Sequence, residues 1–123
     1  MQIRIANRQD EAPIRALLEK QGTVLDLKAA DRDLHNIDQG YFAHDGLLLV
    51  AEAEGEIIAI AGARQSANDK SVLQVIRLAP QSFLSGTAGG AIRERFISII
   101  RNHAYQMDFN TVQVPDELAI LVS

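Results

Sequence analysis

The residues of this sequence best suited to chemistry form a glycine-rich run, Ser85-Gly86-Thr87-Ala88-Gly89-Gly90-Ala91. An apolar run over 72–79 precedes it and indicates a strand, and a periodic run over 92–103 follows it and indicates a helix. Small residues let the backbone approach a ligand, and the free N–H groups and dipole of a helix N-terminus attract an anion. The pattern therefore predicts a phosphate-binding turn that leads into a helix.

Two common phosphate-binding motifs do not fit this run. A P-loop needs a lysine and a serine or threonine after its last glycine, whereas Gly90 is followed by Ala91 and Ile92. A dinucleotide fingerprint needs three glycines in the pattern G-x-G-x-x-G, and over residues 86–91 alanine takes two of these places. The run is then either a site for another phosphate ligand or a flexible loop without a ligand.

The composition excludes several classes of protein. The chain has 123 residues, 47% of them hydrophobic, which suits a single globular domain over residues 1–123. A formal net charge of −4 argues against a nucleic-acid partner, because such domains usually carry a basic surface. The absence of cysteine excludes disulfides and thiolate metal sites, and the three histidines lack the spacing of metal ligands, so we expect no metal.

The sequence predicts neither a membrane span nor a signal peptide. The longest apolar run, Ile57 to Ala63, is too short to cross a bilayer. Met1 leads directly into alternating residues, without the apolar segment of a signal peptide. We therefore expect a cytoplasmic protein with no membrane partner.

Hydrophobic periodicity predicts the elements that must position the glycine run. Alternation over 2–7 predicts a strand, and helical spacing predicts helices around 14–18 and over 31–39. The candidate N-caps are Asn7 or Asp10 for the first helix and Asp31 or Asp33 for the second. A hairpin is predicted from strands over 47–53 and 56–63 around the turn Glu54-Gly55. Further elements are a strand over 72–79, a helix over 92–103 and a strand over 111–114. This order favours an α/β fold with a mixed sheet covered by helices.

The order of elements and several local stretches resemble the GCN5-related N-acetyltransferase (GNAT) superfamily. The stretch Leu49 to Ala59 looks like the second and third strands of that family with their turn, and Ile76-Arg77-Leu78-Ala79 is similar to its fourth strand. Weaker similarity lies over 3–10 and 33–42. The resemblance implies a GNAT-like fold, with a mainly antiparallel sheet that splits open near the end of the fourth strand, and acetyl-CoA as co-substrate.

Members of the family usually continue past the fifth strand, into a region that often holds the tyrosine that protonates the CoA thiolate. Here only Pro115 to Ser123 follow, and they contain no tyrosine. The resemblance therefore implies a C-terminally truncated version of the fold. Since an exposed sheet edge invites partners, we expect the tail to pair with a second copy in a homodimer.

The family holds the CoA pyrophosphate with a pattern of Arg or Gln, two residues, Gly, one residue, then Gly or Ala. Two registers are possible, one with Ser85 in the first place and one, with a longer loop, with Gly86 there. Both lack the Arg or Gln. The first register puts Pro80, which has no N–H, where the fourth strand should donate to the pantetheine arm, so we prefer the second, with Leu78 as donor. The implied cofactor residues are Leu78, Ala79, Gly86, Thr87, Ala88, Gly89, Gly90 and Ala91.

Acyl transfer to an amine also needs a base, an oxyanion donor and a proton for the thiolate. The resemblance implies the N–H of Leu78 as oxyanion donor and places Gln74 where some members have a catalytic glutamate. The spacing selects none of the possible substitutes for that base, which are His35, His44, Asp45 and Glu52. Arg93 and Arg95 are either a solvated helix face or contacts to a CoA phosphate. His103 is expected to pack against the sheet.

The resemblance thus implies an acetyl-CoA-dependent N-acetyltransferase that acts on a small-molecule or peptide amine. The missing Arg or Gln, the missing tyrosine and Gln74 favour an alternative, a non-catalytic GNAT-like module that binds an acyl-CoA or a protein partner. A third possibility is a structural interaction domain without a ligand.

Overall fold

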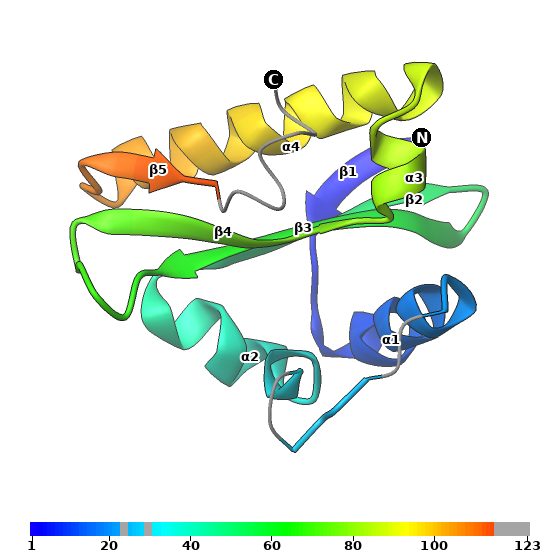
Figure 1. The fold of residues 1–123 in the computed structure, drawn as a ribbon, viewed down its shortest axis with the longest axis horizontal. Coiled ribbons are helices and arrows are strands. Elements are labelled where there is room, and N and C mark those ends of the chain that lie inside the picture. The colour runs from blue at the N-terminus through cyan, green and yellow to red at the C-terminus, as the bar shows by residue number, and fades with distance from the viewer. Residues whose placement is uncertain (23–24, 29–30, 115–123) are drawn as a thin grey trace.

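A five-stranded sheet forms the centre of the computed structural model, and helices cover both of its faces (Figure 1). The structure describes residues 1–22, 25–28 and 31–114. The strands are β1 (Gln2–Ile5), β2 (Leu47–Ala53), β3 (Glu56–Gln65), β4 (Val72–Ala79) and β5 (Thr111–Gln113), and they lie in the sheet in that order. Neighbouring strands are antiparallel, except that β4 and β5 are parallel.

The β2–β3 hairpin is confirmed. Its turn residues Glu54 and Gly55 both have left-handed backbones, with φ of 54° and 81°, as a tight two-residue turn requires. Residues 47–51 of β2 are all buried rather than alternating, because helices lie against both faces of the sheet.

The first helix, α1 (Glu11–Lys20), has Asp10, one of the two predicted candidates, at its N-cap position, but the Asp10 side chain makes no capping hydrogen bond to α1. Asn7 and Asp10 act together in a capping box around a short 3-10 turn over 8–10 that leads into α1. The Asn7 side chain accepts from the N–H of Gln9, and the Asp10 carboxylate accepts from the N–H of Asn7 at 2.8 Å.

The second predicted helix, over 31–39, is wrong as a single element. The structure breaks this segment and its continuation into the 3-10 helix η2 (Arg32–Leu34), the short helix α2 (Ile37–Gly40) and the 3-10 helix η3 (Phe42–His44). The predicted caps are wrong too, since Asn36 caps α2 by accepting from the N–H of Gln39. The physical reason is that the carboxylates of Asp31 and Asp33 are bound to Arg77 of β4.

The glycine-rich run is not a turn, which corrects the prediction that the helix begins at Ile92. A short helix, α3 (Gln81–Leu84), follows β4, and the long helix α4 (Thr87–Gln106) already begins at Thr87. Gly86 is its N-cap, with extended backbone angles. The rest of the run therefore lies in the first turns of α4.

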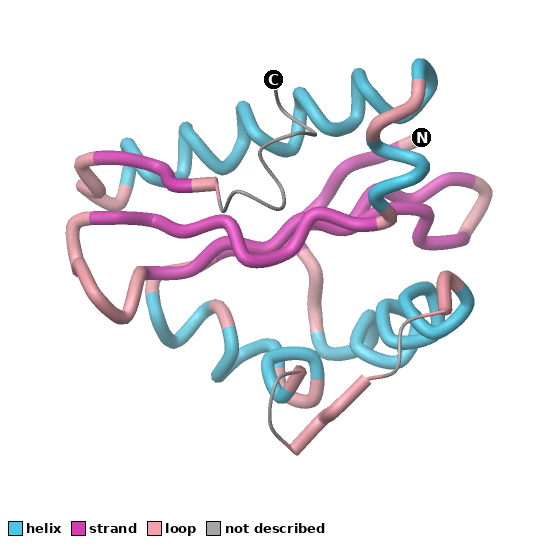
Figure 2. Tube along the Cα trace, in the orientation of Figure 1, coloured by secondary structure: helices cyan, strands magenta, loops and turns pink. Residues whose placement is uncertain are grey.

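Helices lie on both sides of the sheet (Figure 2). The core accordingly has two layers, one on each face of the sheet. On one face, Ile92, Phe96 and Ile100 of α4 pack against small and aliphatic residues of β2, β3 and β4. On the other, α1 and the segment 34–41 contribute Ile14, Leu34, Ile37 and Tyr41, all fully buried.

The end of the chain carries β5, slightly shorter than the predicted strand over 111–114. The apolar tail, Leu118 to Val122, lies outside the described residues, so the truncated fold and the homodimer through this tail stay predictions. Among the described helices, none is long and apolar enough to cross a membrane.

Candidate functional site at the open edge of β4

The sheet opens along the second half of β4. Only Val72 to Gln74 pair with β5, and from residue 75 to 79 the outer edge of β4 has no strand partner in the described part of the chain. α3 and α4 form the crossover between these parallel strands. The peptide groups of an unpaired strand edge can bind an extended ligand as a neighbouring strand would.

A β-bulge at Ile76 sits at the start of this open edge. In the ladder with β3, Val75 pairs with Ala63 and Arg77 with Gly62, so Ile76 is an extra residue. The extra residue shifts by one position which side chains of β4 point to each face of the sheet. Val75 and Leu78 both join the core layer under α4, while Arg77 reaches η2 on the opposite face.

A cavity of about 380 Å³ lies beside the end of β4. Residues 76–82 line one side, and Leu18 and Gln21 line the other. Leu78 and Ala79, two of the predicted cofactor residues, are therefore at the cavity, whereas residues 86–91 do not line it.

The start of α4 presents free backbone donors. The first N–H with an acceptor in the helix is that of Gly90, which donates to the carbonyl of Gly86 at 2.9 Å. The N–H groups of Thr87, Ala88 and Gly89 precede it and have no helical acceptor. Thr87 and Ala88 are exposed, so these donors suit an anion at the positive end of the helix dipole.

Gly89 has a packing role that the sequence analysis missed. A Cβ at this position would lie 1.9 Å from the carbonyl oxygen of Phe83 and 2.6 Å from its carbon, so only glycine lets α4 lie against α3. The close backbone approach that Gly89 allows is to α3. At Gly90, by contrast, the nearest atom to a Cβ would be a nitrogen of Arg93 at 3.8 Å. Two adjacent glycines look alike in a sequence, and only the packing separates them.

Arg93 is not simply part of a solvated helix face. Its Nη1 donates to the carbonyl of Leu84 at 3.2 Å, at the end of α3, and its Nε is buried without a partner among the described residues. Arg95 is exposed, as expected of a surface position.

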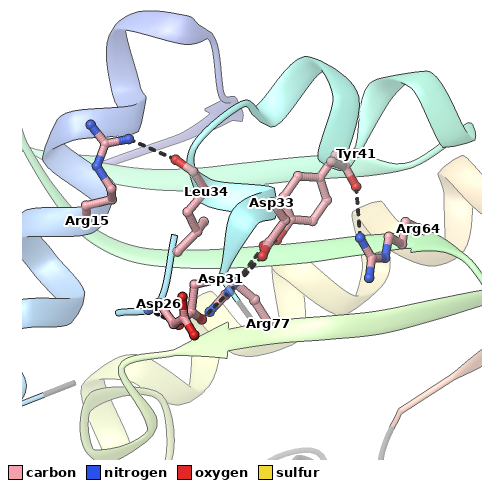
Figure 3. A network of polar contacts seen from close by, with 9 residues as sticks. Arg15, Asp26, Asp31, Asp33, Leu34, Tyr41, Arg64 and Arg77 are labelled. Carbon is pink, nitrogen blue, oxygen red and sulfur yellow. Dashed lines mark hydrogen bonds and ion pairs between the residues drawn. The ribbon is translucent and has the colours of Figure 1, made fainter. Parts of the chain in front are cut away.

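A network of buried polar groups links η2 to β4 (Figure 3). The Arg77 guanidinium donates from Nε and Nη2 to both oxygens of Asp33, at 2.7 and 2.9 Å, and from Nη2 to Asp31 at 2.8 Å. The hydroxyl of Tyr41, which is fully buried, donates to Asp33 at 2.5 Å. We call Arg77, Asp31, Asp33 and Tyr41 the β4 clasp. Sequence reasoning assigned the two aspartates to helix caps because the cation that binds them lies far away in the chain.

The clasp sets the ionisation of its members. Burial disfavours the Asp33 carboxylate, but the hydrogen bonds from Arg77 and Tyr41 outweigh this and lower the pKa of Asp33. The N–H of Asp26 and the guanidinium of Arg77 lower the pKa of Asp31. Burial raises the pKa of Tyr41 well above its ordinary value, so its hydroxyl stays protonated and donates.

These shifts predict an acid-sensitive fold. Because folding lowers the pKa of Asp31 and Asp33, their contribution to stability is fully present above the ordinary aspartate pKa of about 4 and is lost as the pH falls through the lowered values. We expect the urea midpoint to fall steeply below about pH 4 and the Asp33→Asn variant to show a flatter acid limb. Equal slopes for both proteins between pH 5 and 2 would contradict this assignment.

The structure brings none of the described candidate bases to the cavity. Glu52 is bound to Arg4 at 2.8 Å on the β1–β2 pair, His35 is exposed on the α2 side, and Gln74 lies before the bulge. His103 is partly buried, and its Nε2 lies 2.9 Å from the carbonyl oxygen of Asp45. Among the described residues that line the cavity there is neither a histidine nor a carboxylate.

The sequence matches no protein-family model and no curated protein. The three-dimensional structure matches many solved chains. A GNAT-family acetyltransferase from Staphylococcus aureus Mu50 aligns with a TM-score of 0.72 at 15% identity, over 92% of this chain and 71% of that chain. This chain has the GNAT fold.

Two further structures extend the comparison. The ribosomal-protein-alanine N-acetyltransferase of Brucella melitensis aligns with a TM-score of 0.69 at 16% identity, over 98% of this chain and 79% of that chain. The diaminobutyrate acetyltransferase of Paenibacillus lautus, solved with its substrate and coenzyme A, aligns with a TM-score of 0.65 at 21% identity, over 92% of this chain and 63% of that chain. The GNAT-like mixed sheet expected from the sequence is thereby confirmed.

Proposed function

We propose that this chain binds acetyl-CoA along the open edge of β4 and transfers the acetyl group to an amine of a small molecule or peptide. The observation that carries the proposal is the outer edge of β4 after Gln74, which has no strand partner among the described residues and lies beside a cavity of about 380 Å³, in a GNAT fold. The coenzyme A complex of the Paenibacillus lautus enzyme, which shares this fold, supports a CoA thioester as the ligand.

In this proposal, the pantetheine arm lies against Leu78 and Ala79, and the pyrophosphate binds the N–H groups of residues 87–89 at the start of α4. Gly86, Gly90 and Ala91 flank these donors. The position of Pro80 supports the longer register, because Pro80 lies outside β4 as the N-cap of α3 and removes no donor from the strand. α3 supplies the extra loop length that this register needs.

The proposed reaction forms a bond between the amine nitrogen and the thioester carbonyl carbon and breaks the carbon–sulfur bond. The N–H of Leu78 stabilises the oxyanion, and the thiolate leaves and takes up a proton. Since neither a histidine nor a carboxylate lines the cavity among the described residues, the amine loses its proton through water in this scheme.

The same observation favours a second candidate, a GNAT-like module that binds an acyl-CoA or a protein partner without catalysis. Calorimetry with acetyl-CoA, followed by a thiol-release assay with a panel of amines, separates the two. Heat and thiol release support the transferase, heat alone supports the binding module, and no heat rejects both cofactor proposals.

Ala88→Asp tests the proposed pyrophosphate site without disturbing the fold. Ala88 is exposed in the first turn of α4, where a carboxylate stabilises the helix by about 0.3–1 kcal/mol. The same charge repels a phosphate and competes for its donors, so we expect acetyl-CoA to bind about tenfold more weakly by calorimetry. Ser98→Asp, an exposed position further along α4, adds the same charge and should bind as the unmodified chain does. Equal affinities for both variants would place the pyrophosphate elsewhere.

A further inference from the structure

The residue just before Leu78 is the centre of the β4 clasp. Arg77 makes three hydrogen bonds, all to the carboxylates of Asp31 and Asp33, and its side chain is mostly buried. Its partners belong to the segment that follows α1, far from β4 in the chain. The ion pairs of Arg77 thus hold β4, whose outer edge has no strand partner among the described residues, to the segment that contains Asp31 and Asp33.

We propose that Arg77 is a positioning residue, which holds the β-bulge of β4 and thereby directs the backbone N–H of Leu78 on the open edge. The part of this inference that concerns the reaction rests on the function proposed above. Arg77 acts through the backbone of its neighbour and not on the substrate.

The alternation of β4 supports this role. In a regular strand Arg77 would lie on the same face as Leu73 and Val75, in the apolar layer under α4, where an unpaired charge is very costly. The bulge at Ile76 turns Arg77 to the opposite face, where two carboxylates receive it, and Leu78 takes the apolar place instead. The ion pair and the bulge therefore require each other.

Further contacts hold the residues of the clasp that lie away from β4, namely Asp33 and Tyr41. Tyr41 binds Asp33, and its ring lies directly over Gly62, the residue of β3 that pairs with Arg77. A Cβ on Gly62 would lie 2.6 Å from Cε1 of Tyr41. Each residue of this group therefore contacts the next: Arg77 binds Asp33, Asp33 binds Tyr41, Tyr41 packs on Gly62, and Gly62 pairs with Arg77. Asp31 is tied to Asp26 by two hydrogen bonds of 2.8 Å.

Arg77→Lys tests the proposal, because lysine keeps the charge and loses the planar fork. Arg4→Lys is the matched control, since Arg4 makes the same kind of fork with Asp10 and Glu52 on β1, away from the bulge. The first measurement is amide hydrogen exchange by NMR on the free chain. Loss of one charged hydrogen bond should speed exchange of the protected amides among residues 77–79 about tenfold in Arg77→Lys and leave them unchanged in Arg4→Lys.

The second measurement is catalysis. We expect Arg77→Lys to lower kcat for thiol release about tenfold, with the acetyl-CoA Kd within about threefold of the unmodified value, and Arg4→Lys to change neither. Unchanged exchange at 77–79, or equal effects of the two variants, would overturn the proposal. Failure of the unmodified chain to bind acetyl-CoA would reject the proposed function, while the exchange data would still decide the role of the clasp.

A further variant keeps the proposal testable if Arg77→Lys does not fold. Tyr41→Phe removes only the hydroxyl that holds Asp33 and leaves no charge unpaired. It should speed exchange over 77–79 in the same direction and by a smaller factor, and its failure to do so would also overturn the proposal.

Discussion

Gly89→Ala is expected to destabilise the chain by about 3 kcal/mol, whereas Gly90→Ala is expected to stabilise it by about 0.5–1 kcal/mol. The new methyl at position 89 would overlap the Phe83 carbonyl, 1.9 Å away, and this atom is backbone that can move only if α3 shifts. At position 90 the methyl meets nothing closer than 3.8 Å and removes the entropic penalty of a helical glycine.

Urea denaturation of the two single variants measures both effects. Both variants replace a glycine with alanine at adjacent positions in the first turns of α4. They therefore share the change in helix propensity and differ only in the packing of the new methyl group. If both glycines instead served ligand approach, the two variants would have similar stabilities and both would bind acetyl-CoA weakly. A Gly89 substitution that unfolds α3 would also move the end of β4, so Gly89 is unsuitable as a probe of the pyrophosphate site.

Arg77→Met is expected to cost about 3–5 kcal/mol, because it leaves the buried carboxylate of Asp33 and the partly buried carboxylate of Asp31 without their cation. The side chain of Asp33 is only 6% exposed, so water cannot replace the lost partner. Arg8→Met is the control. It breaks an ion pair with Asp38 in which both side chains are well exposed, and it should change the unfolding midpoint little.

The measurement is again the free energy of unfolding from urea titrations at neutral pH. Arg77→Met combined with Asp31→Asn and Asp33→Asn should recover a large part of the loss, since the triple variant buries no unpaired charge. A loss for Arg77→Met as small as that for Arg8→Met would show that the clasp is weak, and the positioning role would then fail with it.

Local patterns in the sequence predicted the elements whose cause is local. The alternating strands around Glu54-Gly55, the strand over 72–79 and the Asn7–Asp10 cap all depend on residues a few positions apart, and the structure has them where expected. The order of these elements, together with the resemblance of the stretches over 49–59 and 76–79, indicated the GNAT fold, which the solved structures confirm.

The candidate site was only partly predictable. Leu78 and Ala79 line the cavity beside the end of β4, and their assignment to a cofactor stays a prediction. The packing role of Gly89 was missed because its close neighbour, the Phe83 carbonyl, belongs to a helix that no periodic pattern marks. The assignment of Gly89 to a cofactor stays a prediction. The homodimer and the choice of amine likewise stay predictions.

Hydrophobic spacing and turn residues thus determine the strands and the core of the long helices of this chain, since those preferences act over one or two turns of backbone, but they determine neither the short helices over 32–44 nor α3. Tertiary contacts decided where β4 bulges, which way Arg77 faces and what Asp31 and Asp33 bind. A charged side chain accepts burial only where a partner of opposite charge is already held, and that partner comes from a segment more than forty residues away in the chain.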